Sequence, residues 1–254
     1  MNGNYREEIL EIKKEAIEKV NDDVKEVYSQ HKEVLGGLLI MLIDLFDRYS
    51  KEGRFHANRY EREKILKEVK ETIVKETKQL ITRDIHISKD ALEEIIRKSH
   101  EEHMKLWGSR GSTTLTPLFI QEIIFRDYKG STFNNRIMEN KKKLANRLYV
   151  EFDKGLKKHA TLVELSHSIQ ETFKRSNYES YRLLMTEQAR VFEEVQRNAF
   201  LISEMVDRVM WVAALCENTC PYCEMMDGSI FAVDDPNKPE IPAHVFCQCC
   251  WVPV

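Results

Sequence analysis

Apolar residues in the first half of the chain recur every three or four positions, the spacing that places side chains on one face of an α-helix. The longest stripe lies within residues 5–48, and similar stripes cover residues 60–81 and 88–107. The first consists of Ile9, Ile12, Ala16, Val20, Val24 and Val27. These patterns predict long amphipathic helices whose apolar faces line a core.

Polar and glycine-containing stretches predict where these helices stop. Residues 51–58 are polar and predict a connection, and Ser88 is placed to cap the third helix. Gly36-Gly37 predict a break or a close helix crossing, because paired glycines are poor helix formers. The apolar run Val34–Ile43 is shorter than the roughly 20 residues that span a bilayer, so it predicts a buried helix–helix contact instead.

The second half of the chain contains several helix start signals. Thr116-Pro117 predicts a helix cap followed by a proline at the first helical position. Gly130-Ser131-Thr132 predicts the end of one helix and the start of the next. Thr161 and Glu164 have the spacing of a capping box. We expect a short helix through residue 173 and a last long helix over residues 178–205. The small, polar stretch 109–114 predicts a domain boundary or hinge.

Composition limits the possible function classes. Hydrophobic residues make up 42% of the chain and charged residues 32%, which suits exposed helices around a core. The net charge of -3 implies no overall field that would attract nucleic acid. We interpret the local basic cluster of Lys141–Lys143 with Arg136 and Arg147 as a solvated helix face. The polar residues 1–8 do not form a secretory signal, so we expect a reducing cytoplasm.

All cysteines of the chain are concentrated near its end, between Cys216 and Cys250. Cys220 and Cys223 form a C-x2-C pair, and His244, Cys247 and Cys249 follow after a spacer of 20 residues. Two thiols on one tight turn bind a metal from one side, and a second pair completes a tetrahedron. In a reducing compartment such a cluster indicates metal ligands rather than disulfides.

The spacing leaves the ligand set open. Cys220 and Cys223 are the first pair, and the second is either Cys247 with Cys249 or His244 with Cys247. We expect Cys216 and Cys250 not to be ligands. Four protein ligands form a closed, structural zinc site, whereas a catalytic zinc keeps one position open for water.

Two short apolar runs, Val209–Ala214 and Gly228–Val233, have β-strand character and flank the first cysteine pair. They predict a hairpin, so the expected fold is mainly α, with a helical body and a small C-terminal β-hairpin and zinc-knuckle module. We divide the chain into a helical domain at residues 1–108, a linker and connecting helix at 109–129, and a module at 130–254 that ends in the knuckle at 209–254.

No motif makes a positive case for an enzyme. Cys220-Pro221-Tyr222-Cys223 matches a glutaredoxin active site, but the residues after it cannot form the βαβ unit that this motif requires. A zinc deaminase needs His-x-Glu before its cysteine pair, and here the histidine follows it.

Glu187 and Arg190 predict a local ion pair, worth about 0.3–0.5 kcal/mol if exposed. We interpret His100 and His103 as surface residues.

A longer series of residues resembles one known family. The series consists of Thr186-Glu187, Arg190, Trp211, the Thr219-Cys220-x2-Cys223 turn, Asp227-Gly228, Pro242 and the final His244-x2-Cys247-x-Cys249. It is similar to the C-terminal region of phage head morphogenesis proteins, the minor head proteins similar to the Mu F protein. The resemblance covers residues 130–254. Cys216 stands where the family usually has Asp, and Gln248 where it usually has Arg.

The resemblance implies a structural virion component. Proteins of this family are made in the host cytoplasm and enter the capsid in few copies during prohead assembly. They act through portal and capsid proteins, and in some phages they accompany the DNA during packaging or ejection. We therefore expect a virion location near the portal, an oligomeric assembly, no membrane and no catalysis. A zinc-containing nucleic-acid-binding protein and a metal-dependent hydrolase are the alternatives.

Overall fold

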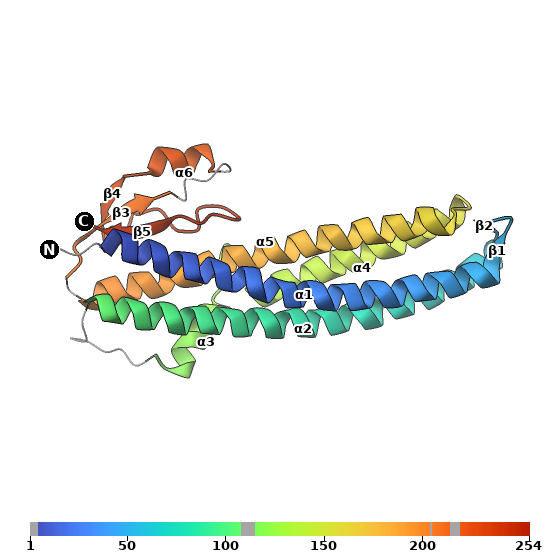
Figure 1. Cartoon of the computed structure of the whole chain (residues 1–254), viewed down its shortest axis with the longest axis horizontal. Coiled ribbons are helices and arrows are strands. Elements are labelled where there is room, and N and C mark those ends of the chain that lie inside the picture. Colours follow the sequence, from blue (N-terminus) through green and yellow to red (C-terminus); the bar gives the residue numbers. More distant parts are fainter. Residues whose placement is uncertain (1–4, 108–114, 204, 214–218) are drawn as a thin grey trace. The chain divides into compact units, whose positions relative to one another are not determined.

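The computed structural model describes residues 5–107, 115–203, 205–213 and 219–254 (Figure 1). It is 74% helical and has a small antiparallel sheet near the C-terminus, which confirms the predicted mainly α fold with a C-terminal β module. Residues 109–114, the predicted boundary, lie outside the described residues. The helices are α1 (Tyr5–Tyr49), α2 (Arg59–Trp107), α3 (Pro117–Phe125), α4 (Phe133–Lys157), α5 (Leu162–Ser203) and α6 (Pro221–Met226). The strands are β1 (Ser50–Lys51), β2 (Arg54–Phe55), β3 (Arg208–Val212), β4 (Ile230–Ala232) and β5 (Cys250–Pro253).

The chain forms two compact units, each assembled from separate stretches of sequence. One, which we call the helical unit, comprises Val24–Ile87 and Asn134–Tyr181. The other, the sheet unit, comprises Met1–Asp23, Ser88–Phe133 and Arg182–Val254. Neither unit corresponds to a continuous segment, because α1, α2 and α5 each contribute residues to both.

The core of the helical unit is formed by apolar residues that recur at helical spacing on α1, α2, α4 and α5. On α1 these are Val34, Leu38, Leu42 and Leu45, all buried. The β1–β2 hairpin closes with Glu52 and Gly53 at positive φ, the backbone that a two-residue turn needs. This hairpin adds Phe55 to the core, where its backbone N donates to the carbonyl of Ala160 at 3.1 Å.

One part of the predicted basic face is wrong. Lys142 and Lys143 are exposed, but Lys141 is only 1% exposed and lies inside the helical unit, with its Nζ 2.6 Å from Asp84 Oδ2. Lys141 precedes the buried Leu144 and Leu148 on the same face of α4. Sequence alone did not reveal a buried carboxylate on α2 that would pair with it.

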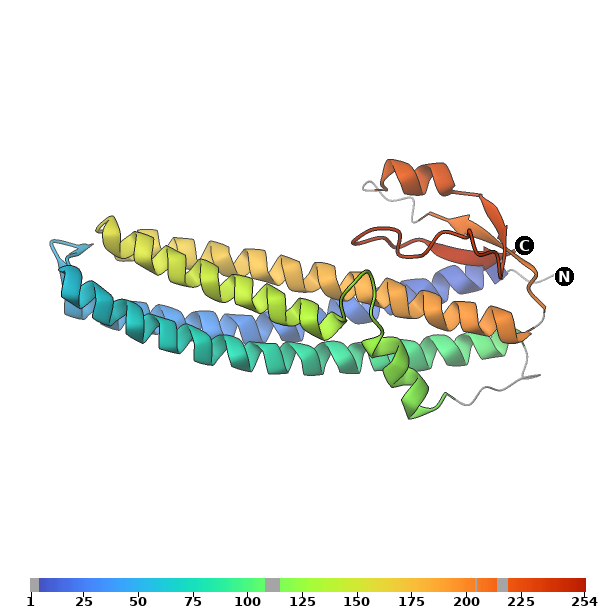
Figure 2. The ribbon, with the colours of Figure 1, turned by 180° about the vertical axis from the view of Figure 1, so that it is seen from behind.

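The sheet unit contains a three-stranded sheet of order β4-β3-β5, with β3 antiparallel to both neighbours. The β3–β4 hairpin was predicted, whereas β5 was not. β5 places Trp251 opposite Trp211, and their rings meet edge to face with centroids 5.2 Å apart. Both views of the ribbon show this sheet beside the first turns of α1, with α6 on its far side (Figures 1 and 2).

Two predicted helix caps are confirmed. Thr116 caps α3, with its Oγ1 accepting from Phe119 N at 3.1 Å. Thr161 and Glu164 form the capping box of α5, each side chain accepting from the backbone N of the other, at 3.2 and 2.8 Å.

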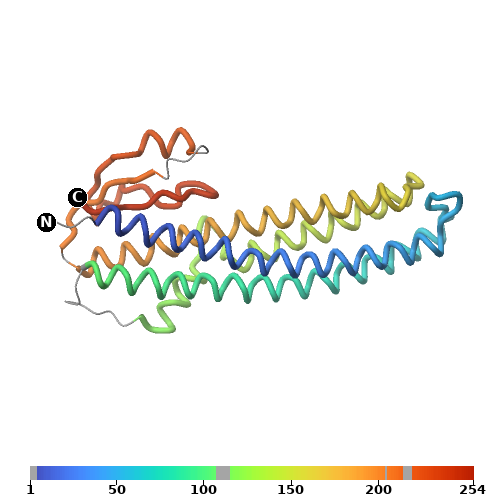
Figure 3. The backbone as a smooth tube through the Cα atoms, in the orientation of Figure 1, coloured from blue at the N-terminus to red at the C-terminus, as the bar shows by residue number. Residues whose placement is uncertain are grey.

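The predicted interruptions inside the long helices are wrong. α1 continues through Gly36-Gly37, α2 through Ser88, and α5 joins the two stripes that were expected as separate helices (Figure 3). Ser88 is itself buried and follows the buried Asp84 by one turn, so the buried face of α2 continues along the same side of the helix. The free energy gained by burying such a continuous apolar face is larger than the cost of about 1 kcal/mol for a glycine or another weak helix former inside the helix.

Candidate metal centre

The first pair of thiols is positioned by the short helix α6. Cys220 is its N-cap residue, with the Sγ accepting from Cys223 N at 3.3 Å, and Pro221 occupies the first helical position. A helix that starts in this way places Cys220 and Cys223 about one turn apart on the same side. The two cysteines therefore face the same point.

The second group of candidate ligands lies in a loop that is anchored to other parts of the sheet unit. Tyr128 Oη and Lys129 Nζ donate to the carbonyl of Pro242, which follows a cis peptide bond. Phe246 N donates to Thr186 Oγ1 at 3.0 Å, and Gln248 Nε2 donates to the carbonyl of Met185 at 3.0 Å. The bonds of Phe246 and Gln248 attach the loop to α5 on either side of Cys247.

The five predicted ligand residues are brought together. His244 Nε2 lies 3.1 Å from Cys220 Sγ and 3.2 Å from Cys223 Sγ, and Cys223 Sγ lies 3.9 Å from Cys247 Sγ. Cys220, Cys223 and His244 form one group that could hold a metal ion, and Cys223, Cys247 and Cys249 form a second. Cys223 is common to both, so one ion bound beside it can draw ligands from each group.

The orientation of His244 would allow it to bind a metal ion. Its Nδ1 lies 2.9 Å from the carbonyl of Val245, to which it can donate a hydrogen bond. That bond leaves the Nε2 lone pair directed at the two thiols, and this is how ligating histidines are usually fixed. Of the two arrangements left open by the sequence, the geometry favours the one in which His244 binds directly.

The charge balance of the cluster favours a bound cation. A hydrogen bond from Cys249 lowers the pKa of Cys247 to about 5, and the backbone N–H of Cys223 lowers the pKa of Cys220. Burial and the neighbouring charge of Cys247 raise the pKa of Cys223 to about 12. Some thiolates therefore form readily, but the central one does not ionise unless a positive charge offsets its neighbours.

One positive charge close to this cluster comes from α1. Lys13 is 3% exposed, its Nζ lies 4.7 Å from the ring centroid of Phe192, and burial lowers its pKa to about 8. The charges of Cys250, Cys247 and Cys249 act in the opposite direction and favour the ammonium form. Nothing in the sequence linked Lys13 with cysteines more than two hundred positions away.

Other residues of the series that carried the family resemblance form the support of this centre. Asp227 Oδ1 accepts from Ala213 N at 2.8 Å, and Gly228 N donates to the carbonyl of Trp211 at 2.9 Å. Gln196 on α5 accepts from Trp251 N at 3.3 Å through Oε1. No pattern in the sequence indicated the role of Gln196.

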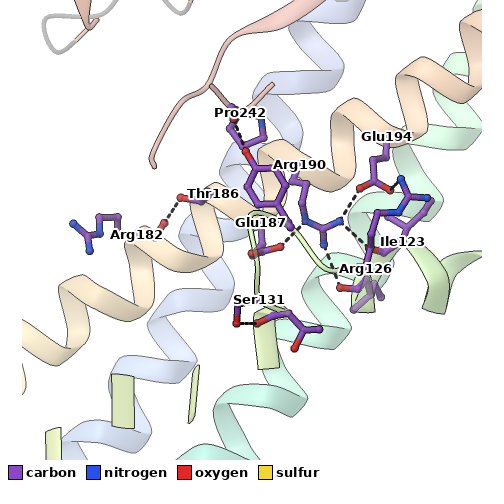
Figure 4. Close-up of polar contacts among 12 residues, drawn as sticks. Ile123, Arg126, Ser131, Arg182, Thr186, Glu187, Arg190, Glu194 and Pro242 are labelled. Atoms are coloured by element: carbon purple, nitrogen blue, oxygen red, sulfur yellow. Dashed lines mark hydrogen bonds and ion pairs between the residues drawn. The ribbon is translucent and has the colours of Figure 1, made fainter. Parts of the chain in front are cut away.

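The predicted pair of Glu187 and Arg190 is buried rather than exposed, since each side chain is 2% exposed (Figure 4). Arg190 Nε lies 2.7 Å from Glu187 Oε2, and Nη1 lies 2.8 Å from Glu194 Oε1. The guanidinium also donates to the carbonyls of Ile123 and Ile124, at 2.8 and 3.2 Å, where α3 ends. Arg190 therefore links α5 to the last turn of α3.

Three further predictions have different outcomes. Cys250 is buried in β5 opposite Val212 and belongs to neither ligand group, whereas Cys216 lies outside the described residues. His103 is not a surface residue, because it is fully buried with its Nδ1 2.6 Å from the carbonyl of Ser99. Within the described part of the chain, no helix has the length and apolar content needed to cross a membrane.

A scan against known protein families and searches of characterised proteins and of solved structures found no match to this chain.

Proposed function

We propose that the C-terminal cluster is a structural zinc site and that the chain is a minor head protein of a phage, acting in prohead assembly. The observation that carries the zinc assignment is the approach of His244 Nε2 to within 3.1 and 3.2 Å of two thiols that share one helical turn. Thiolate and imidazole ligands in a tetrahedral set are the preference of zinc among the common biological metals.

We assign Cys220, Cys223, His244 and Cys247 as the zinc ligands. Cys247 takes the fourth position in this proposal, with its Sγ 3.9 Å from that of Cys223. Cys249 then stays beside the metal and donates to the Cys247 thiolate, as a partner that orients a ligand. In this proposal no position is left open for a catalytic water.

The alternative of a metal-dependent hydrolase has less support. A catalytic zinc requires an open position and usually a carboxylate that activates water. Asp227 Oδ1 already accepts the Ala213 N–H, and Glu224 is exposed on α6. The nucleic-acid alternative is also weakened, because Lys141 pairs with Asp84 and Arg147 with Glu179 instead of forming a free basic face.

The assembly role rests on the series of residues that resembles the phage family. Thr186, Trp211, Asp227 and Gly228 all contribute contacts that shape one module, and the loop with His244 is bonded to Thr186 on α5. Bound zinc would hold the small sheet against the helix and make its surface rigid, because the module has too few apolar residues to stabilise this arrangement alone. Portal and capsid proteins are the proposed partners, within the virion and near the portal, with phage DNA as a further contact.

Metal content is the first test. The purified chain should contain one zinc ion per molecule by mass spectrometry, and a strong chelator should remove it with a red shift of tryptophan fluorescence, because Trp211 and Trp251 are fully buried beside the site. Cys223→Ser should have the same effect. A chain that contains no metal, and whose fluorescence is unchanged by Cys223→Ser, would contradict the zinc assignment.

The assembly role needs a separate experiment. The chain is co-expressed with the portal and capsid proteins of the same genome, and the particles are purified. We expect it to co-purify with portal-containing particles, and the Cys223→Ser variant to be depleted from them. Absence of the wild-type chain from all such particles would exclude the assembly role and leave the zinc site unaffected.

A further inference from the structure

The part of α1 that lies in the helical unit has an apolar face on the side opposite the core. Its inward side is formed by the buried Val34, Leu38 and Leu42. On the outward side Ile40 is 70% exposed and Ile43 is 47% exposed. A Cβ added at Gly36 or Gly37 would meet no atom within 4 Å other than the backbone of its own helix, so no other described segment covers α1 at these two positions.

A line of residues on this side combines charge with apolar surface. Lys32, Gly36, Ile40, Ile43 and Asp47 follow one another at spacings of three and four, which keeps them on one stripe of a helix. We call this stripe the α1 outer face. Lys32 and Asp47 are exposed at its two ends, and neither pairs with a charged residue in the part of the chain that the structure describes.

The α1 outer face is complementary to itself when two copies run in opposite directions. With the symmetry axis between residues 39 and 40, Lys32 of one copy lies opposite Asp47 of the second, and Gly36 lies opposite Ile43. A small residue opposite a large one lets two helices approach closely. Parallel copies would instead place Lys32 against Lys32, which disfavours that arrangement.

We propose that the α1 outer face joins two copies of this chain through antiparallel α1 helices. The contact is isologous, because the same patch serves both copies and each pair of contacts occurs twice. The stretch from Lys32 to Asp47 is about 24 Å long, so one pair of helices buries less than a standard interface of roughly 1,600 Å². We therefore expect a reversible dimer whose population depends on protein concentration.

This inference goes beyond the zinc site and the assembly role and depends on neither. The test uses the metal-loaded full chain in sedimentation equilibrium over a wide range of concentration. The wild type should fit a monomer–dimer equilibrium, and Ile40→Glu should weaken the dimer by at least about tenfold. Val163→Glu is the matched control, because Val163 is 77% exposed in the same unit but lies on α5, and it should leave the dissociation constant unchanged.

Charge reversal tests the antiparallel pairing itself. Lys32→Asp and Asp47→Lys should each weaken the dimer, and combining them in one chain should restore it, because both ion pairs then form with reversed signs. Gly36→Leu should weaken the dimer while leaving the monomer folded by circular dichroism, since its side chain enters open space.

The proposal is overturned if the wild type stays monomeric at all concentrations, or if Ile40→Glu behaves like Val163→Glu. A dimer that the double charge reversal does not restore would overturn the antiparallel arrangement. None of these outcomes affects the zinc measurement, so the two proposals can fail separately.

Discussion

Lys141 Nζ lies 2.6 Å from Asp84 Oδ2 in the interior of the helical unit, where the two side chains are 1% and 3% exposed. The imidazole of His31 lies against the same carboxylate oxygen, with its Nε2 3.3 Å away, and Ser180 Oγ accepts from Lys141 at 2.9 Å. Burial alone would raise the pKa of Asp84, but the contact with His31 and the charge of Lys141 lower it below the usual value. The carboxylate therefore remains ionised inside the unit.

Removing one member of this pair should be costly, because the other charge is left buried without a partner. We expect Asp84→Ala and Lys141→Ala each to reduce the free energy of unfolding by about 3–5 kcal/mol. The double variant Asp84→Leu/Lys141→Met should lie close to the wild type or above it, since no charge remains buried. Urea denaturation measures all three, and Lys142→Met, an exposed neighbour, should change stability by less than about 0.5 kcal/mol.

Acidification should remove the contribution of the pair. The pKa of Asp84 is lower in the folded chain than in the unfolded one, so its contribution is complete above about pH 4 and is lost as the pH falls through the folded-state pKa. The stability difference between wild type and Asp84→Ala should therefore shrink in acid. A difference that stays constant down to the lowest accessible pH would contradict this charge state.

The ligand set can be resolved by two serine substitutions in neighbouring positions. Cys247→Ser should abolish or strongly weaken metal binding, whereas Cys249→Ser should retain one metal per chain with an affinity lowered by about 10–100-fold, as for a group that orients a ligand. The absorption of the cobalt-substituted chain should indicate three thiolates in the wild type and in Cys249→Ser. The reverse order of effects would show that Cys249, and not Cys247, completes the site.

Replacement of Arg190 should disconnect α3 from α5. Arg190→Ala leaves the buried Glu187 carboxylate without its ion pair and two carbonyls without a donor, so we expect a loss of about 3–5 kcal/mol in the sheet unit. Arg190→Lys should recover only part of it, because an ammonium group cannot reproduce the planar fork. Tryptophan fluorescence during denaturation reports on this unit. Arg197→Ala, which removes an exposed arginine of the same helix, is the control.

His103 should make the sheet unit sensitive to mild acid. Burial lowers its pKa from 6.5 to about 4, so the folded chain binds the proton less readily than the unfolded chain. Stability is therefore complete above about pH 6.5 and falls as the pH decreases toward 4, with a total loss on the order of 3 kcal/mol.

The variant His103→Gln tests this dependence without removing all polar contacts to Ser99 and Gln196. Its stability relative to wild type should improve steadily between about pH 6.5 and pH 4, because glutamine does not titrate in this range. The comparison is made at each pH, so that titration of other groups cancels. Parallel pH profiles of the two proteins would exclude His103 as the origin of any acid lability.

Short-range patterns in the sequence predicted the local structure well where one interaction dominates. Thr116 and Thr161 cap helices as expected, because a cap depends only on residues within one turn. The β3–β4 hairpin and the approach of Cys220 to Cys223 follow the same logic. The breaks expected at Gly36-Gly37 and Ser88 did not occur, because these weak signals compete with burial of a long helical face.

By itself, the sequence determined the mainly helical fold, the position of the small sheet and the set of five residues that could bind a metal. Only the tertiary structure decided which polar side chains are buried: Lys141, His103 and Arg190 all looked like surface residues. Each of them also has a partner on another helix: Lys141 on α4 pairs with Asp84 on α2, Arg190 donates to the carbonyl of Ile124, 66 positions away, and His103 lies 93 positions from its neighbour Gln196. The physical reason is that a buried polar group needs hydrogen-bond or ion partners, and for these three residues some of the partners come from a distant segment, which periodicity along one helix does not reveal.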